Sequence, residues 1–153
     1  VVDDLRAAAP QRQVDWSIGD GLLAWGDPGL LRLVVQNLLG NAFKYTAQKE
    51  SARIEFGVEE RTGDSVVYFV RDDGSGFDPG LAGKLFRPFS RLHRSDEFEG
   101  SGIGLATVDR IIRRPGGAVS AEGRKGEGAT FRFRLPVPRR TASDYEAPAA
   151  GTA

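Results

Sequence analysis

Hydrophobic and polar positions along this chain follow two periods, one typical of strands and one typical of helices. Short strand-like runs of β-branched and aromatic residues occur at 13–18, 21–26, 53–60, 65–71, 118–123 and 129–136. The first two runs flank a Gly19–Asp20–Gly21 turn, which predicts a hairpin. The third and fourth are separated only by the polar residues 61–64, which predicts a second hairpin.

Two longer segments carry apolar residues at helical spacing. The first begins at Asp27–Pro28, a capping acid followed by proline, and should run to about Thr46. Its apolar stripe consists of Leu31, Val34, Val35, Leu38, Leu39 and Ala42. The second should run from about Gly102 to Arg114, where Pro115–Gly116–Gly117 stops it. Residues 81–92 are typical of short helical turns. These elements predict an α/β fold, a two-layer sandwich of a mixed sheet against about three helices.

The composition is that of one globular domain with polar ends. We expect residues 1–12 to be the remnant of an upstream linker, 13–137 to form the domain, and 138–153 to be a disordered tail. The chain contains no methionine, so it is expected to be a piece of a longer protein. No apolar run has the roughly 20 residues that span a bilayer. We expect this domain to be cytoplasmic, and the parent protein could be soluble or membrane-anchored.

Charge and residue usage narrow the possible functions. The 21 basic and 21 acidic residues balance, which argues against a nucleic-acid partner. Zero cysteines exclude disulfides and cysteine-ligated zinc, and the single histidine, His93, does not favour a histidine metal site.

The first predicted helix carries a second, polar stripe beside its apolar one. Asn37, Asn41 and Lys44 fall within about 60° of one another around the helix axis. Asparagine gains little on a solvent-facing helix surface, but its amide oxygen suits a Mg²⁺ ion that already carries phosphates and waters. Lys44 would add positive charge against phosphate oxygens. The alternative is a solvated helix face with two unrelated asparagines.

Two glycine-containing segments supply the remaining chemistry. Asp72–Asp73–Gly74–Ser75–Gly76 ends a predicted strand in a turn, where an aspartate can accept a hydrogen bond from the exocyclic amine of adenine. An ordinary acidic turn is the competing interpretation. Gly100, Gly102 and Gly104 open the second helix, whose free amides and dipole favour an anion. That spacing alone is common, and it is neither a lysine-bearing phosphate loop nor a dinucleotide-binding βαβ unit.

Taken in order, these segments closely resemble the catalytic ATP-binding domain of bacterial sensor histidine kinases. The similarity covers roughly residues 13–136 and is greatest to phytochrome-type and PAS-linked kinases. It extends to the superfamily shared with gyrase, Hsp90 and MutL, whose architecture is the Bergerat-type fold. The segments that carry it are NLLGNAFKYT (37–46), DDGSG (72–76), KLFRPFSRL (84–92), GSGIGLATV (100–108) and GEGAT (126–130) followed by FRFRLP.

The resemblance implies a role for each matching position. Asn41 would coordinate Mg²⁺ with help from Asn37, and Asn41 and Lys44 would be the catalytic residues. The ATP contacts would come from Asn37, Asn41, Lys44, Tyr45, Asp72, Gly74, Gly76, Phe89, Gly100, Gly102, Gly104, Leu105 and Thr130. Within this set Asp72 would accept the adenine amine and Thr130 would lie near the base. A lid at 77–101 would be anchored by Phe86 and Phe89, with Arg87 or Arg91 available to phosphate.

Two positions depart from the family pattern, and the single histidine is a separate question. Pro115 occupies a position where relatives commonly have histidine. Gln36 occupies a position where relatives often have an acidic residue, and glutamine cannot act as a base. His93 lies in the predicted lid without an acidic helical neighbour, so we interpret it as a loop residue. The resemblance therefore implies that this fragment, expected to be monomeric, donates the γ-phosphate to a histidine on an upstream dimerisation domain. A response regulator would act downstream through the parent kinase.

Two other functions remain open at this stage. The domain could be a serine kinase of the anti-sigma-factor type, although the phenylalanine segment and lid argue against it. It could also be a nucleotide-binding regulatory module that signals by lid ordering without transfer. ATPase action like that of gyrase or Hsp90 is less favoured because the lid is short.

Overall fold

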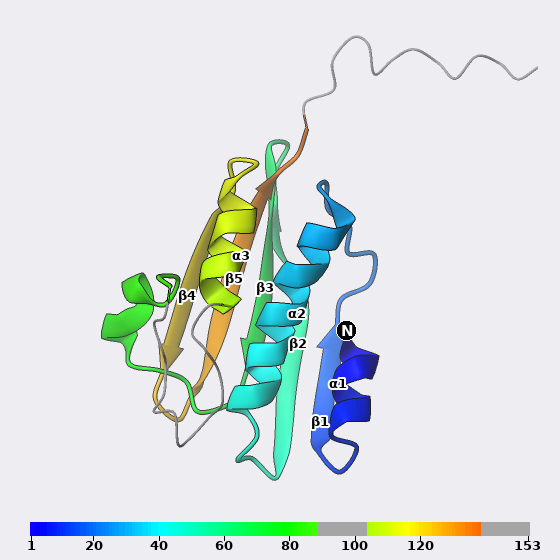
Figure 1. Ribbon diagram of the computed structural model, residues 1–153, viewed down its shortest axis with the longest axis vertical. Coiled ribbons are helices and arrows are strands. Elements are labelled where there is room, and N and C mark those ends of the chain that lie inside the picture. The colour runs from blue at the N-terminus through cyan, green and yellow to red at the C-terminus, as the bar shows by residue number, and fades with distance from the viewer. Residues whose placement is uncertain (89–103, 139–153) are drawn as a thin grey trace, which may run out of the picture.

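A five-stranded mixed sheet forms one layer of the molecule, and helices cover one of its faces (Figure 1). The computed structural model describes residues 1–88 and 104–138. The strands are β1 (Gln13–Ile18), β2 (Ser51–Arg61), β3 (Ser65–Asp72), β4 (Ala118–Arg124) and β5 (Gly128–Pro136). Their order is β1-β2-β3-β5-β4, with β1 and β2 parallel and every other pair antiparallel. The predicted two-layer sandwich with a mixed sheet is confirmed.

The helical layer consists of α1 (Val2–Ala8), α2 (Pro28–Tyr45) and α3 (Gly104–Arg113), with a 3₁₀ turn η1 (Pro79–Lys84) beside β4. α2 and α3 lie next to each other on the sheet (Figure 1). The Asp27 side chain caps α2 by accepting a hydrogen bond from Leu30 N at 3.0 Å. Gly116, with φ +94°, ends α3, and Gly117 N returns a hydrogen bond to Ile112 O at 3.0 Å. Local capping thus explains where α2 begins and where α3 ends.

The core lies between the two layers. Alternate residues of β3 and β5 point toward the helices and are buried there: Val66, Tyr68, Val70, Phe131, Phe133 and Leu135. The helices contribute Val34, Leu38, Leu39 and Ala42 from α2, and Leu105, Val108 and Ile112 from α3. This packing holds the C-terminal end of β3 beside the last turns of α2.

The prediction of a strand at 21–26 is wrong. β1 pairs in parallel with β2, so the expected first hairpin does not form. Gly21, with φ +62°, turns the chain, and Leu22, Leu23 and Ala24 line a small apolar cavity of about 180 Å³. The Tyr68 hydroxyl donates a hydrogen bond to the Leu23 carbonyl oxygen there, so a side chain rather than a neighbouring strand satisfies this backbone group.

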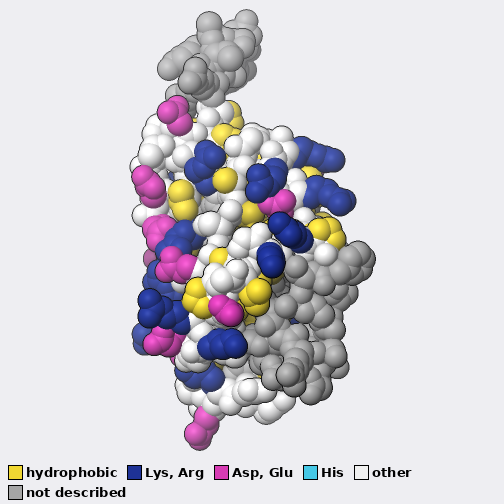
Figure 2. Space-filling model, turned by 90° about the vertical axis from the view of Figure 1, so that its left-hand side faces the viewer, with side chains coloured by type: hydrophobic (Ala, Val, Ile, Leu, Met, Phe, Trp, Pro, Cys, Tyr) yellow, Lys and Arg dark blue, Asp and Glu magenta, His cyan; other side chains and the backbone are white. Residues whose placement is uncertain are grey.

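The N-terminal residues also differ from expectation, since Val2–Ala8 form a helix in the segment interpreted as a linker. Val1, Val2 and Leu5 pack against the core. Among the described residues, no helix is long and apolar enough to cross a membrane. Figure 2 shows acidic and basic side chains interspersed on the described part of the face that it presents.

Candidate functional site

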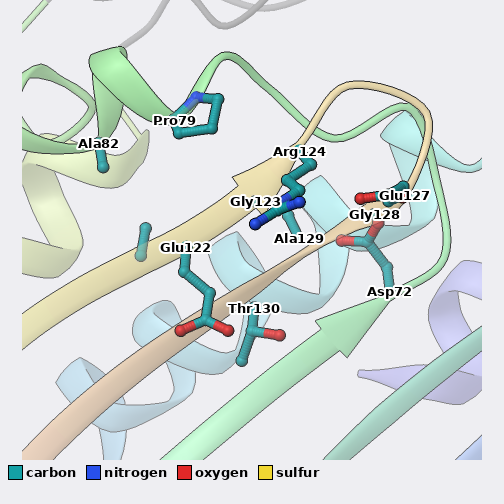
Figure 3. A pocket seen from close by; sticks show the side chains of 11 residues that line it. Asp72, Pro79, Ala82, Glu122, Gly123, Arg124, Glu127, Gly128, Ala129 and Thr130 are labelled. Atoms are coloured by element: carbon teal, nitrogen blue, oxygen red, sulfur yellow. The ribbon is translucent and has the colours of Figure 1, made fainter.

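Asp72 is the buried carboxylate of a pocket at the C-terminal end of β3. Its side chain is 6% exposed, and its Oδ1 accepts a hydrogen bond from Gly74 N at 2.9 Å. The pocket has a volume of about 490 Å³ and is open to solvent between β3, β5, β4 and η1 (Figure 3). Pro79, Ala82, Ala121 and Ala129 contribute apolar surface to it. The pocket is also lined by the exposed Glu122, Arg124 and Glu127 and by the buried Thr130. A buried carboxylate beside apolar surface is suited to orienting a flat ligand with an amine.

The environment of Asp72 changes its protonation behaviour. Burial raises the pKa of Asp72 to about 6, and the negative charge of Asp73 adds to this effect. The Gly74 N–H, the Ala129 N–H and Lys49 act in the opposite direction and stabilise the ionised form. At neutral pH the carboxylate is therefore mainly ionised and can accept hydrogen bonds.

The neighbouring Asp73 has a different task, which is to anchor the turn to β2. Its Oδ1 accepts a hydrogen bond from Arg53 N at 2.9 Å, and its Oδ2 lies 3.1 Å from Lys49 Nζ. Asp73 N also donates to Arg53 O at 3.3 Å. Because these contacts fix the backbone directly after Asp72, they set the direction in which the buried carboxylate points.

Glycines allow three backbone segments to approach the acidic turn. A Cβ atom at Gly74 would overlap the Tyr45 carbonyl oxygen at the end of α2. One at Gly76, which has φ +63°, would overlap the Arg124 carbonyl oxygen at the end of β4. One at Gly128 would overlap the carbonyl oxygen of Asp72 itself. Side chains at these positions would force the segments apart, so the glycines shape the wall of the pocket.

The polar stripe of α2 adjoins this turn. Asn37, Asn41, Lys44 and Tyr45 are all half-buried. Asn37 Nδ2 donates to Leu33 O at 2.8 Å, which turns its Oδ1 toward Gly104, where a Cβ atom would overlap it. Lys44 Nζ lies 4.7 Å from the centroid of the Tyr45 ring. The structure therefore brings the asparagine stripe against the first turn of α3.

Two backbone hydrogen bonds join the site together. Ser75 N donates to Tyr45 O at 3.0 Å, which fixes the acidic turn to the end of α2. Gly126 N donates to Ser75 O at 2.8 Å, which fixes the β4–β5 turn to the same serine. Three segments far apart in sequence thus share one corner of the molecule.

Thr130 lies in this region with an unexpected orientation. The register of β3 and β5 places Ala129 opposite Asp72, and Thr130 opposite Arg71. Because side chains alternate along a strand, the Thr130 hydroxyl is on the opposite face of the sheet from the Asp72 carboxylate. It accepts a hydrogen bond from Arg71 Nε at 3.3 Å. The adenine contact of Thr130 stays a prediction, and Ala129 is the closer position.

Several predicted residues fall outside the described part of the chain. These are Phe89, Arg91, His93, Gly100 and Gly102, together with most of the lid expected at 77–101. Of the described ones, Phe86 packs edge-on against Phe131 with 6.3 Å between ring centroids, and Arg87 is exposed. Leu105 is buried in the core, so only its backbone could face a ligand.

The close contact between Phe77 and Gly123 was not predicted from the sequence. Phe77 is 1% exposed, and a Cβ at Gly123 would lie 2.7 Å from its ring. Gly123 therefore leaves space for the aromatic side chain that follows the acidic turn. An isolated glycine within the strand-like run 118–123 was the available signal for such a close approach.

Comparison with known proteins identifies the family. Residues 26–139, most of the chain, match the family model described as histidine kinase-, DNA gyrase B-, and HSP90-like ATPase. The chain belongs to this ATPase family. It is 42% identical over 115 residues to cyanobacterial phytochrome A of Nostoc, a match that covers 75% of this chain and 15% of the phytochrome.

Solved structures agree with the family assignment. The mycobacterial sensor histidine kinase MprB superposes with a TM-score of 0.73 at 22% identity, covering 88% of this chain and 90% of that one. Full-length ShkA in complex with AMPPNP superposes with a TM-score of 0.69 at 28% identity, covering 92% of this chain and 30% of ShkA. The fold of this ATPase domain is thus that of a histidine kinase ATP-binding module.

Proposed function

We propose that this domain binds ATP with Mg²⁺ and donates the γ-phosphate to a histidine on a separate dimerisation domain, in two-component signalling. The observation that carries the proposal is the ionisable Asp72, buried in a pocket that the Tyr45–Ser75 hydrogen bond joins to the asparagine stripe of α2. Membership of the ATPase family and the likeness to a structure that contains AMPPNP support ATP as the nucleotide.

The base would be selected by Asp72. Its carboxylate accepts a hydrogen bond from the exocyclic amine of adenine, whereas guanine presents a carbonyl oxygen at that position and would be repelled. Gly74 and Gly76 leave room for the base to reach the carboxylate. Ala129, opposite Asp72 in the sheet, offers apolar surface next to it.

The phosphates and metal would lie between α2 and α3. The described residues contain no group of three or more His, Cys, Asp or Glu side chains that could hold a metal by themselves. The amide oxygens of Asn37 and Asn41 fit instead a Mg²⁺ ion that takes most ligands from phosphates and water. Lys44, Tyr45 and the backbone at Gly100, Gly102, Gly104 and Leu105 would hold the triphosphate. When bound, the metal neutralises charge on the phosphates.

The acceptor must come from elsewhere. The chain spans 15% of the length of the phytochrome relative, and we assign the phosphoacceptor histidine to a dimerisation domain distinct from this ATPase domain. A response regulator would receive the phosphate through the parent kinase, in the cytoplasm. The ATPase domain contributes positioning and charge stabilisation for in-line transfer.

The test is phosphotransfer in trans. The 153-residue chain is mixed with γ-labelled ATP, Mg²⁺ and the dimeric histidine domain of its own parent kinase. We expect acid-labile label on the acceptor, lost with Asn41→Asp or Asp72→Asn and kept with Asp64→Asn, which changes an exposed turn acid. Acid-stable label would indicate a serine kinase. Tight ATP binding without transfer to the cognate acceptor would contradict the proposal and favour the regulatory module.

A further inference from the structure

The C-terminal end of α2 carries the side chains assigned to phosphate, and each of its last four carbonyl groups has a hydrogen-bond donor. Such groups have no partner within the helix itself and need one from elsewhere. The donors are Thr46 Oγ1 for Ala42 (2.8 Å), Arg12 for Phe43, Ala47 N for Lys44 (3.1 Å) and Ser75 N for Tyr45 (3.0 Å). Two donors follow the helix directly, and two come from distant segments.

Arg12 is one of these distant donors, and its guanidinium is held at three points. One nitrogen, Nη1, donates to Phe43 O, and the other, Nη2, donates to Thr46 Oγ1 at 2.8 Å. The guanidinium carbon lies 4.0 Å from the centroid of the Phe43 ring, which stacks in turn on Trp16. The planar fork of arginine makes these contacts together, which the single ammonium of lysine cannot do.

The contacts reach a fully buried residue. Thr46 is 0% exposed and uses its hydroxyl hydrogen toward α2, so Arg12 is the donor to its oxygen. A cation at this end of a helix also offsets the partial negative charge of the carbonyl groups. Without it, an anionic ligand at Lys44 would face that negative charge at short range.

Arg12 connects the N-terminal segment to the last turn of α2. Arg12 directly precedes β1 and lies outside residues 26–139, the part that matches the ATPase family model. Lys44 and Tyr45 lie between Phe43 and Thr46, the two residues that Arg12 holds. The N-terminal segment is therefore tied to the helical turn assigned to the phosphates.

We propose that Arg12 is a positioning residue, which fixes the last turn of α2 so that Lys44 and Tyr45 meet the phosphates of the nucleotide. The inference rests on the proposed function, because it assigns that turn to ATP. It predicts that losing Arg12 weakens the binding of phosphates more than the binding of the base.

The experiment compares ATP·Mg²⁺ and adenosine as ligands of the complete chain by titration calorimetry. Arg12→Ala should weaken ATP binding roughly tenfold, the size of one charge-assisted hydrogen bond, and leave adenosine binding within about twofold. Arg12→Lys should recover only part of the loss. Arg6→Ala is the matched control and should change neither affinity. The Arg6 side chain is 61% exposed, and within the described part of the chain its ion pair is with Asp3 at 3.9 Å.

Other results of this titration would contradict the role proposed for Arg12 or the proposed function. Equal losses for ATP and adenosine would show a general structural role and overturn the inference, as would unchanged ATP affinity. Arg12→Gln, which retains a stem and a donor, replaces Arg12→Ala if the alanine variant does not fold. Failure of the unmodified chain to bind ATP would instead overturn the proposed function. Thr46→Val removes the contact with Arg12 and also the hydrogen bond from Thr46 Oγ1 to Ala42 O. It should reproduce the ATP-selective loss, and its effect should be less than additive with that of Arg12→Ala, because the two changes share one contact.

Discussion

At the scale of single residues, the adjacent acids Asp72 and Asp73 show how environment decides the role of a side chain. Asp73 is 42% exposed and paired with Lys49, so its charge is compensated and it serves as an anchor. Asp72 is 6% exposed, and its hydrogen-bond donors among the described residues are the backbone N–H groups of Gly74 and Ala129. Its charge therefore stays available to a ligand at an energetic cost. The order of the two residues in sequence does not reveal this difference.

The first prediction concerns Asp72→Asn. Because burial raises the pKa of Asp72 to about 6, ionisation costs the free domain stability at pH 7. The amide should therefore stabilise the unliganded domain by about 1–3 kcal/mol, measured by denaturant unfolding. It should also weaken ATP binding by roughly 10–100-fold, since a charged acceptor is lost. Asp64→Asn should alter neither quantity, and a destabilised Asp72→Asn variant would contradict the assigned cost of burial.

The second prediction concerns pH. The folded-state pKa of Asp72, about 6, is above its ordinary value of 3.8. Its contribution to stability is therefore fully present below pH 3.8 and is lost as the pH rises through about 6. Between pH 5 and 7 the unfolding free energy of the unmodified chain should fall relative to that of Asp72→Asn. ATP affinity should change in the opposite sense and decline below about pH 6. A pH-independent difference between the two proteins would be the contrary result.

At the scale of elements, sequence pattern predicted those whose partners are local. A few consecutive residues determine each of three features: the capped start of α2, the β2–β3 hairpin and the end of α3 at its glycines. The prediction of a strand at 21–26 was wrong because the apolar residues of this segment line a cavity. β1 pairs instead with β2, which follows it in the sequence only after α2. Register is likewise not visible in the sequence, and it places Ala129 opposite Asp72 and Thr130 opposite Arg71.

The third prediction uses two helical glycines as a matched pair. No atom of the described residues lies within 4 Å of a Cβ at Gly40, so Gly40→Ala should stabilise α2 by about 0.5–1 kcal/mol. A Cβ at Gly104 would overlap Asn37 Oδ1, the end of a flexible side chain that can rotate away. Gly104→Ala should therefore keep the fold and weaken Mg²⁺-dependent ATP binding, measured by calorimetry with and without the metal. Unchanged Mg²⁺ dependence would mean that the Asn37 orientation is not needed.

At the scale of the whole molecule, the site depends on contacts that tie separate parts of the chain to one corner. Tyr45, Ser75 and Gly126 are linked in series by backbone hydrogen bonds, and Asn37 adjoins Gly104. The sequence indicates the motifs and their order, because each has a local signature of glycine, acid or asparagine. It does not indicate the links, which use backbone groups common to all residues. The contact of Arg12 with α2 escaped prediction because it joins residues that lie 31 and 34 positions apart in the sequence.

The last prediction follows from this assembly. Since α2, the acidic turn and α3 all contribute to the site, ATP·Mg²⁺ should bind only the folded chain and stabilise it as a whole. At a free ligand concentration of 100 times Kd, the gain is about 2.7 kcal/mol, visible as a rise in Tm. The rise should shrink when a chelator removes Mg²⁺. At the same ATP concentration the gain for Asp72→Asn should fall to about 0.4–1.4 kcal/mol, because its Kd is 10–100 times larger. GTP should give little shift, because its base places a carbonyl against the Asp72 carboxylate. Equal shifts for ATP and GTP would contradict base selection by Asp72 while leaving the phosphate site intact.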